Sequence, residues 1–262
     1  MRLEPIINRI EGVIMKKVYE NDEFELYMDD SLEVISEPII KNTLEKFELF
    51  RQIFKQDKLL KSKVFIFDDL EKFRKDACKQ RNIESIPEYS RGWFKENENT
   101  CFLCIDKIPL VGTKLFYKRI SCVAHECFHN LYSKYYYKDN RITWFDEGLA
   151  QYLSGEFEKY SLDDWKNLFL FYRQNSVNVN NINDRINGDE SVPDEFIFKR
   201  KGVFEGYAAS LLAVKYLFDE MGENYVYKLI FDNDSIMKIG LNILDIINEY
   251  YENLFKLGIS KK

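Results

Sequence analysis

The chain has 262 residues, a formal net charge of −6 and a pI near 5.3. Hydrophobic residues make up 45% of it and charged residues 31%, which is typical of a globular protein and not of a disordered one. This length is enough to bury a sizeable core in one large domain or two small ones. The acidic balance argues against a nucleic-acid partner, because the surface that binds nucleic acid is strongly basic.

The sequence shows no targeting or membrane signal. Its first twenty residues, MRLEPIINRIEGVIMKKVYE, carry repeated charges and no continuous apolar stretch, so they do not resemble a signal peptide. No run approaches the roughly 18 apolar residues of a membrane span. The five cysteines are an odd number, which favours reduced thiols over a disulfide framework. We therefore expect a cytoplasmic protein with no membrane partner.

Strands and helices are predicted in alternation along the first half of the chain. Alternating apolar residues predict a half-buried strand over 23–28, and a β-branched and aromatic run predicts a buried strand over 63–67. A third strand is predicted over 100–105, and we assign it as the edge strand of the sheet. Apolar residues at helical spacing predict helices over 35–54 and about 69–79.

Helix dominates the second half. Helices are expected over 118–135, 144–153, 165–173 and 207–221, with two or three more in the last fifty residues. The sequence SLDD at 161–164 resembles the capping box that begins a helix. The Asn-rich segment 174–194 lacks periodicity, which favours a surface connection over an active-site lid.

These elements predict an α+β fold with a small mixed sheet, its edge strand, and a mostly helical C-terminal half. No internal repeat and no Pro/Gly-rich linker divides the chain, so we expect a single unit over 1–262. Within it, the sheet-containing part would cover about 20–115 and the helical part about 116–257.

The only two histidines stand four residues apart in the stretch SCVAHECFHNLY. On a helix, residues at this spacing share one face, so His125 and His129 can direct their rings to a single metal ion. Glu126 follows the first histidine and can reach a water on that ion without being a ligand itself. This H-E-x-x-H pattern predicts two zinc ligands and a general base.

A catalytic zinc site needs a third protein ligand, and no third histidine exists. The best candidate is Glu147, eighteen positions on in TWFDEGLAQYLSG, where a turn and a second helix can return it to the histidines. Gly148 would allow the close helix approach that this requires. The alternative is that Asp146 and Glu147 are ordinary acidic residues in the first turn of a helix.

The two motifs HECFH and WFDEGLAQY resemble those of the gluzincin metallopeptidases, in particular the peptidase MA-like proteins of that clan. The order of elements from about residue 23 to 255 is also similar, although only the two motifs are specific. The resemblance implies a gluzincin-like fold, one zinc ion per chain with His125, His129 and Glu147 as ligands, and Glu126 as base and proton shuttle. It also implies that Tyr207 is the hydroxyl that stabilises the oxyanion. From the residues alone, Tyr207 is as readily a core aromatic.

Other residues near the motifs have several explanations. Asp146 or Gln151 could accept the hydrogen bond that a ligand histidine donates from its other ring nitrogen. The C-x-x-C at Cys101 and Cys104 has no second pair with which to hold a structural zinc, and on a strand the two point to opposite faces. Cys122 lies one turn before His125, and a buried thiol is the favoured interpretation over a metal ligand.

The sequence therefore predicts a zinc-dependent peptidase that acts on peptides or proteins. The large gluzincin aminopeptidases carry G-x-M-E-N on the edge strand, whereas here Gly92 is followed by no Met-Glu-Asn. We expect endopeptidase-like cleavage for this reason. The alternatives are a catalytically silent zinc-binding protein that recognises peptides with the same fold, and a metal-free helical interaction protein. An extended substrate would pair with the predicted edge strand around 101–105.

Overall fold

The computed structural model describes residues 7–10, 13–86, 90–95, 98–136, 142–175 and 203–257. It has a mixed α+β architecture, as predicted. The chain divides into two compact units, one of residues 1–135 together with 153–156, the other of residues 136–152 together with 157–262. Each unit is described separately. Most of the Asn-rich segment 174–194 falls outside the described residues.

The first unit contains a six-stranded sheet in the order β1-β2-β3-β4-β6-β5. Its strands are β1 (Ile7–Ile10), β2 (Val13–Glu20), β3 (Phe24–Met28), β4 (Ser62–Phe67), β5 (Gly92–Lys95) and β6 (Thr100–Cys104). The central strands β3, β4 and β6 run parallel to one another, and the hairpin β1-β2 and strand β5 are antiparallel to their neighbours. The sequence did not predict the N-terminal hairpin or β5.

The edge-strand prediction for 100–105 is wrong. Strand β6 pairs with β4 on one side and β5 on the other, so it is an interior strand with every residue buried. The edge is β5, the four residues Gly92–Lys95. The hydrophobic run in β6 is what an interior strand requires, because both of its faces are covered.

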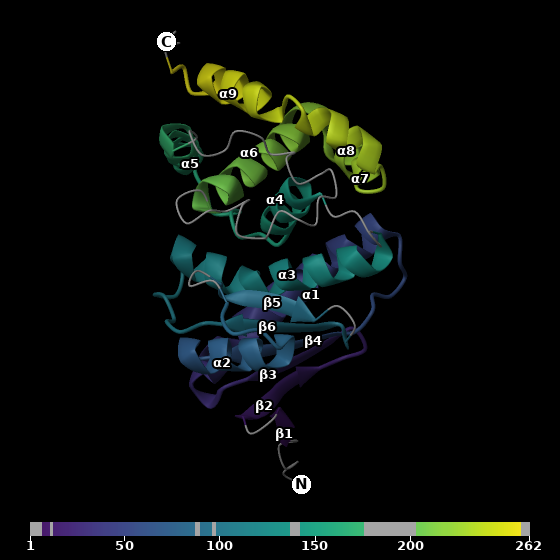
Figure 1. Cartoon of the computed structure of the whole chain (residues 1–262), viewed down its shortest axis with the longest axis vertical. Helices are drawn as coiled ribbons and strands as arrows, with labels where there is room; N and C mark the ends of the chain where they lie inside the picture. Colours follow the sequence, from purple (N-terminus) through teal and green to yellow (C-terminus); the bar gives the residue numbers. More distant parts are fainter. Residues whose placement is uncertain are drawn as a thin grey trace. The chain divides into compact units, whose positions relative to one another are not determined.

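Helices cover both faces of the sheet (Figure 1). Helices α1 (Ser36–Phe54) and α3 (Lys114–Tyr135) pack against one face, and α2 (Leu70–Arg81) lies on the other. A short 3₁₀ helix, Asp30–Ile35, leads into α1. Helix α3 begins four residues before the predicted start at 118, because the Thr113 hydroxyl accepts the backbone N–H of Phe116 and so caps the first turn.

Side chains along each strand alternate between the two faces of the sheet. This alternation determines which residues of β5 point toward α3. Tyr27, Phe65, Phe102 and Trp93 form a ladder of stacked rings across β3, β4, β6 and β5, with successive centroids 4.7, 5.5 and 4.4 Å apart. This ladder belongs to the cluster that includes Phe73 of α2. Since neighbouring residues of a strand point to opposite faces, the residues on either side of Trp93 face α3.

The second unit is helical and is built around α6 (Val203–Met221). Its other helices are α4 (Thr143–Leu153), α5 (Leu162–Asn175), α7 (Glu223–Leu229), α8 (Asn233–Gly240) and α9 (Ile243–Leu254). The predicted capping box at the start of α5 is present, since Ser161 and Asp164 exchange bonds between side chain and backbone N–H. Helix α9 is tied to α6 by the Tyr251 hydroxyl, which donates to the Leu212 carbonyl at 3.0 Å.

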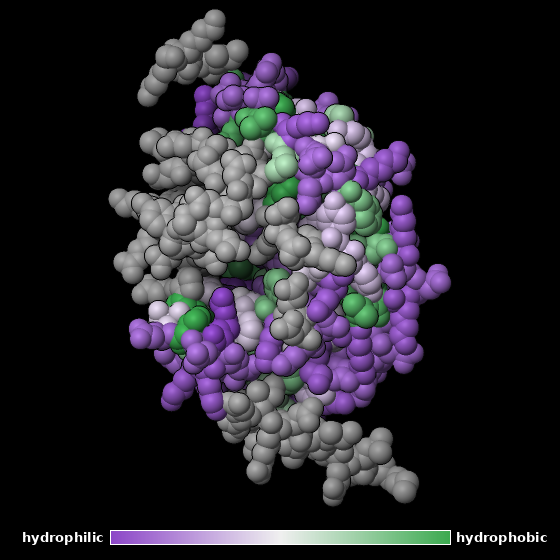
Figure 2. All heavy atoms as spheres, turned by 45° about the vertical axis from the view of Figure 1, so that its right-hand side comes forward, coloured by the Kyte–Doolittle hydropathy of each residue, from purple (hydrophilic) through white to green (hydrophobic). Residues whose placement is uncertain are grey.

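Gly148 sets the distance between α4 and α6. A Cβ at this position would lie 2.5 Å from Val214 Cγ2 and closer still to the Ser210 carbonyl oxygen, so only glycine fits. The sequence-based expectation was that Gly148 lets this helix approach the histidine helix, whereas the close contact recorded at Gly148 is with α6. No described helix has the length and apolar character needed to cross a membrane. Described residues on the face drawn in Figure 2 are mostly hydrophilic, with small separate hydrophobic areas.

Candidate metal centre

Helix α3 presents its two histidines on one face, as their spacing predicts. The Nε2 atoms of His125 and His129 are 3.0 Å apart, and the two rings are nearly perpendicular. His129 is buried, with 3% of its surface exposed, and His125 is partly buried. Two nitrogens that each bind one zinc ion at about 2 Å lie about 3.3 Å apart in a tetrahedral site. The pair is therefore already spaced close to what one ion requires.

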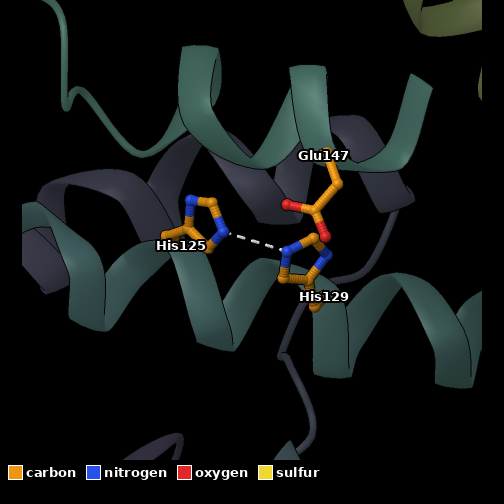
Figure 3. Close-up of side chains that lie close together, drawn as sticks. All are labelled: His125, His129 and Glu147. Carbon is orange, nitrogen blue, oxygen red and sulfur yellow. Dashed lines mark hydrogen bonds between the residues drawn. The ribbon is translucent and has the colours of Figure 1, made fainter. Parts of the chain in front are cut away.

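Glu147 completes a group of three ligand atoms. One atom each from His125, His129 and Glu147 lies within 4.8 Å of the other two, and Figure 3 shows the three side chains directed toward one another. Among the described residues this is the only group of three or more such side chains that could hold a metal ion. Two imidazole nitrogens and one carboxylate oxygen are a ligand set that zinc accepts in catalytic sites. The donor set and its spacing therefore fit a metal ion.

Glu126 lies against the edge strand of the sheet. A Cβ added to Gly92 of β5 would lie 2.7 Å from the carboxyl carbon of Glu126, and closer to one of its oxygens. The carboxyl group of Glu126 therefore occupies the space that any other residue at position 92 would fill. This contact fixes Glu126 beside the backbone of β5, one residue along α3 from His125. The sequence analysis identified both residues but not their contact.

Phe94 brings the same strand to the second histidine. Its ring stacks on the imidazole of His129, with centroids 6.0 Å apart and planes 19° from parallel. Gly92 and Phe94 face α3 because they alternate with Trp93, which belongs to the ring ladder on the other face. Strand β5 therefore contacts both the predicted base and one predicted ligand.

Glu156 is the site residue that sequence reasoning missed. Its carboxylate oxygen Oε1 is 2.6 Å from Nδ1 of His125, and the side chain is only 6% exposed. The sequence analysis proposed Asp146 or Gln151 as the residue that contacts a ligand histidine. The requirement that a ligand histidine has a partner for its other nitrogen was a valid signal. It could not select Glu156, because this residue follows the helix in a turn whose path the sequence does not reveal.

Gln151 has a different role, within the helical unit. Its side-chain amide donates to the backbone carbonyls of Glu147 and Tyr207, both at 3.2 Å. This side chain, together with the contact at Gly148, ties the part of α4 that carries Glu147 to the start of α6. Tyr207 is partly exposed on α6. The structure thus links the helices of Glu147 and Tyr207 through their backbones.

The cysteines are free thiols, and burial raises the pKa of three of them. None of the five cysteines forms a disulfide. Burial raises the pKa of the Cys122 thiol well above its ordinary value, and the charge of Glu156 adds to this effect. Burial also raises the pKa of Cys101, and that of Cys104 to about 12. Because metals bind the thiolate, the raised pKa argues against Cys122 as a metal ligand, and its side chain is partly buried.

Comparison with known proteins adds no family to these observations. No protein-family model matches the chain, and no curated protein matches it in sequence. The site is therefore interpreted from its own geometry, together with the motif resemblance described above.

Proposed function

We propose that this protein is a zinc-dependent metallopeptidase of the gluzincin type that cleaves peptide bonds as an endopeptidase. The observation that carries the proposal is the group formed by His125, His129 and Glu147, with Glu126 beside it on α3. The H-E-x-x-H helix and the W-x-x-E-G-x-A-x-Y helix supply all four residues. The same set of residues would also serve a zinc-binding protein without activity, and the experiment below separates the two.

Each residue has one task in this proposal. His125, His129 and Glu147 would hold the zinc ion, which when bound lowers the pKa of a coordinated water toward about 7 and polarises the scissile carbonyl. Glu126 accepts a proton from the attacking water and later donates it to the leaving amine. The Tyr207 hydroxyl would donate a hydrogen bond to the developing oxyanion. Gly92 has no side chain, which leaves the space beside β5 that the Glu126 carboxylate occupies.

Strand β5 is the element on which an extended substrate would bind. The Cys104 backbone N–H donates to the Arg91 carbonyl, so these two residues form a hydrogen-bonded pair. In an antiparallel ladder such pairs alternate with pairs whose backbone groups point outward. Gly92 and Phe94 therefore direct their N–H and C=O groups to the outer side of β5, although the Gly92 carbonyl also accepts a bond from Ser90. A peptide strand added there would run past Glu126 and His129.

The carboxylates that follow β5 bear on whether the proposed enzyme cleaves within a chain or removes single residues from its end. Two carboxylates after Gly92, Glu96 and Glu98, are the candidates to bind a substrate amine, and Glu98 forms an ion pair with Lys95 at 2.5 Å. The other, Glu96, lies outside the described residues. The proposal of internal cleavage therefore rests on the missing Met-Glu-Asn after Gly92.

Metal analysis and peptide hydrolysis together test the proposal. Protein purified without added metal should contain one zinc ion per chain, and alanine at His125, His129 or Glu147 should greatly reduce this content. Glu126→Gln should keep the fold and the zinc but lose hydrolysis of a mixed peptide pool by about 10² to 10⁴-fold. Glu37→Gln, an exposed glutamate in the first turn of α1, is the matched control and should change neither.

Three results would contradict parts of the proposal. Full zinc content in Glu147→Ala would remove Glu147 as a ligand. Equal hydrolysis by Glu126→Gln and wild type would remove Glu126 from the mechanism. Zinc in the wild type, with peptide binding but no cleavage of any peptide, would identify the protein as a silent zinc-binding protein that recognises peptides.

A further inference from the structure

Glu156 occupies an unusual place for a charged residue. It belongs to the segment Leu153–Glu156, which joins the helical elements α4 and α5 in sequence but packs with the sheet-containing unit. Gly155 directly before it has a φ of +85°, a conformation that glycine adopts without strain. The chain turns at Gly155, and the Glu156 side chain that follows is only 6% exposed.

A buried carboxylate needs a partner that compensates for its lost hydration. The ion pair recorded for Glu156 among the described residues is with His125, whose side chain is 13% exposed. The Glu156 Oε1 lies 2.6 Å from His125 Nδ1, within reach of a hydrogen bond, although the two atoms do not meet the geometry of one in this structure. The partner of Glu156 is thus one specific nitrogen of a predicted zinc ligand.

We propose that Glu156 is the positioning residue of the metal centre, which holds His125 with Nδ1 protonated and Nε2 directed at the metal. A neutral imidazole has one N–H and one lone pair, and the partner of the first nitrogen decides which atom binds the metal. His125 Nε2 already faces His129 Nε2 at 3.0 Å, on the side of the ring away from Nδ1. The carboxylate fixes the ring orientation and also makes the ligand more basic. This inference rests on the proposed metal centre.

Zinc affinity and the protonation of His125 test the role of Glu156. Relative to the wild type, Glu156→Ala should bind zinc about 10 to 100-fold more weakly, as measured by competition with a chelator of known affinity. Glu156→Gln should fall between the two, because its amide oxygen still accepts from Nδ1–H but carries no charge. Glu158→Gln, an exposed glutamate two residues on, is the matched control and should bind zinc as the wild type does.

Nitrogen-15 NMR of the zinc-loaded protein distinguishes positioning from a general structural effect. In the wild type, the His125 Nδ1 should carry a proton with the downfield shift of a bond to a carboxylate. This signal should move upfield in Glu156→Gln while the signals of His129 stay in place. Thermal unfolding of each variant identifies any loss of fold, and the glutamine variant decides the matter if the alanine variant does not fold.

The possible outcomes separate this inference from the proposed function. If the wild type binds zinc and Glu156→Gln matches it in both affinity and His125 spectrum, the role of Glu156 is refuted and the metal centre stands. If the wild type binds no zinc, the proposed function fails, and the role of Glu156 fails with it. Weaker binding together with a shifted His125 signal supports both.

Discussion

Tyr207 is the proposed site residue whose role depends on a single hydroxyl group. Tyr207→Phe should leave zinc content and melting temperature nearly unchanged, because it keeps the aromatic ring and the backbone carbonyl that accepts the bond from Gln151. The value of kcat should fall by about 10²-fold, since the hydroxyl matters once charge has developed on the substrate. The measurement is the steady-state kcat and KM of Tyr207→Phe and of the wild type. The control is Tyr225→Phe, which changes an exposed tyrosine on α7. A rise in KM alone would instead indicate substrate binding or packing.

Asp29 gives a prediction about pH that is independent of the metal centre. This side chain is 8% exposed, and its carboxylate accepts the Asp68 backbone N–H at 3.0 Å. Burial raises the pKa of Asp29, and the bond from Asp68 opposes this only in part. A raised pKa in the folded state means that the protonated form is favoured, so stability is lost as pH rises through that pKa.

Asp29→Asn removes this loss and keeps an oxygen that can accept the same bond. We expect its melting temperature to match that of the wild type near pH 3 and to exceed it increasingly from pH 4 to 7. Thermal unfolding followed by circular dichroism over this range measures the difference. A variant that is less stable than the wild type at pH 7 would show that the charge of Asp29 stabilises the fold, with Lys72 as its attractive neighbour.

Among the elements, strand β5 and helix α3 are in contact where Gly92 meets Glu126. In Gly92→Ala the new methyl group must displace the Glu126 carboxylate, because the strand backbone is fixed by its pairing with β6. A misplacement of about 1 Å can lower a rate by about 10²-fold. We therefore expect a loss of hydrolysis of this order with zinc content unchanged.

Lys95→Ala is the control for this substitution, since it lies on the same strand but on the face of the ring ladder. It should keep nearly full activity. The measurement is the single-turnover rate at which the wild type, Gly92→Ala and Lys95→Ala hydrolyse the same peptide. Full activity in Gly92→Ala would show that the position of Glu126 is not critical, and would weaken its assignment as the base.

At the scale of the whole molecule, the proposed function predicts which peptides are cleaved. A free α-amine held without a carboxylate partner loses hydration and gains no compensating interaction. No Met-Glu-Asn follows Gly92 to supply such a carboxylate, and Glu98 lies in an ion pair with Lys95. We therefore expect an N-acetylated peptide to be cleaved at least as fast as the same peptide with a free N-terminus.

The measurement follows product masses over time for both forms of one peptide. Internal cleavage at the same bond in both is the expected result. Stepwise release of single residues from the free form only would instead indicate an aminopeptidase, with the zinc ligands unchanged. The two peptides differ only at the acetyl group, so each is the control for the other.

The sequence by itself determined the features that depend on local spacing. The i, i+4 spacing of His125 and His129 and the downstream Glu147 predicted the group of three residues that the structure brings together. Helical periodicity located α1, α3 and α6 to within a few residues at each end. These predictions succeeded because an amphipathic helix repeats its pattern over several turns, which a single chain segment contains completely.

Only the tertiary structure decided the features that depend on contacts between distant segments. Strand β5 has four residues with a glycine among them, too short and irregular to show an alternating pattern, and its position at the edge depends on pairing with β6. Glu126 beside Gly92 joins residues 34 positions apart, and Glu156 beside His125 joins residues 31 apart. No periodic signal records such contacts, because they follow from how the sheet, the helices and the turn at Gly155 pack in three dimensions.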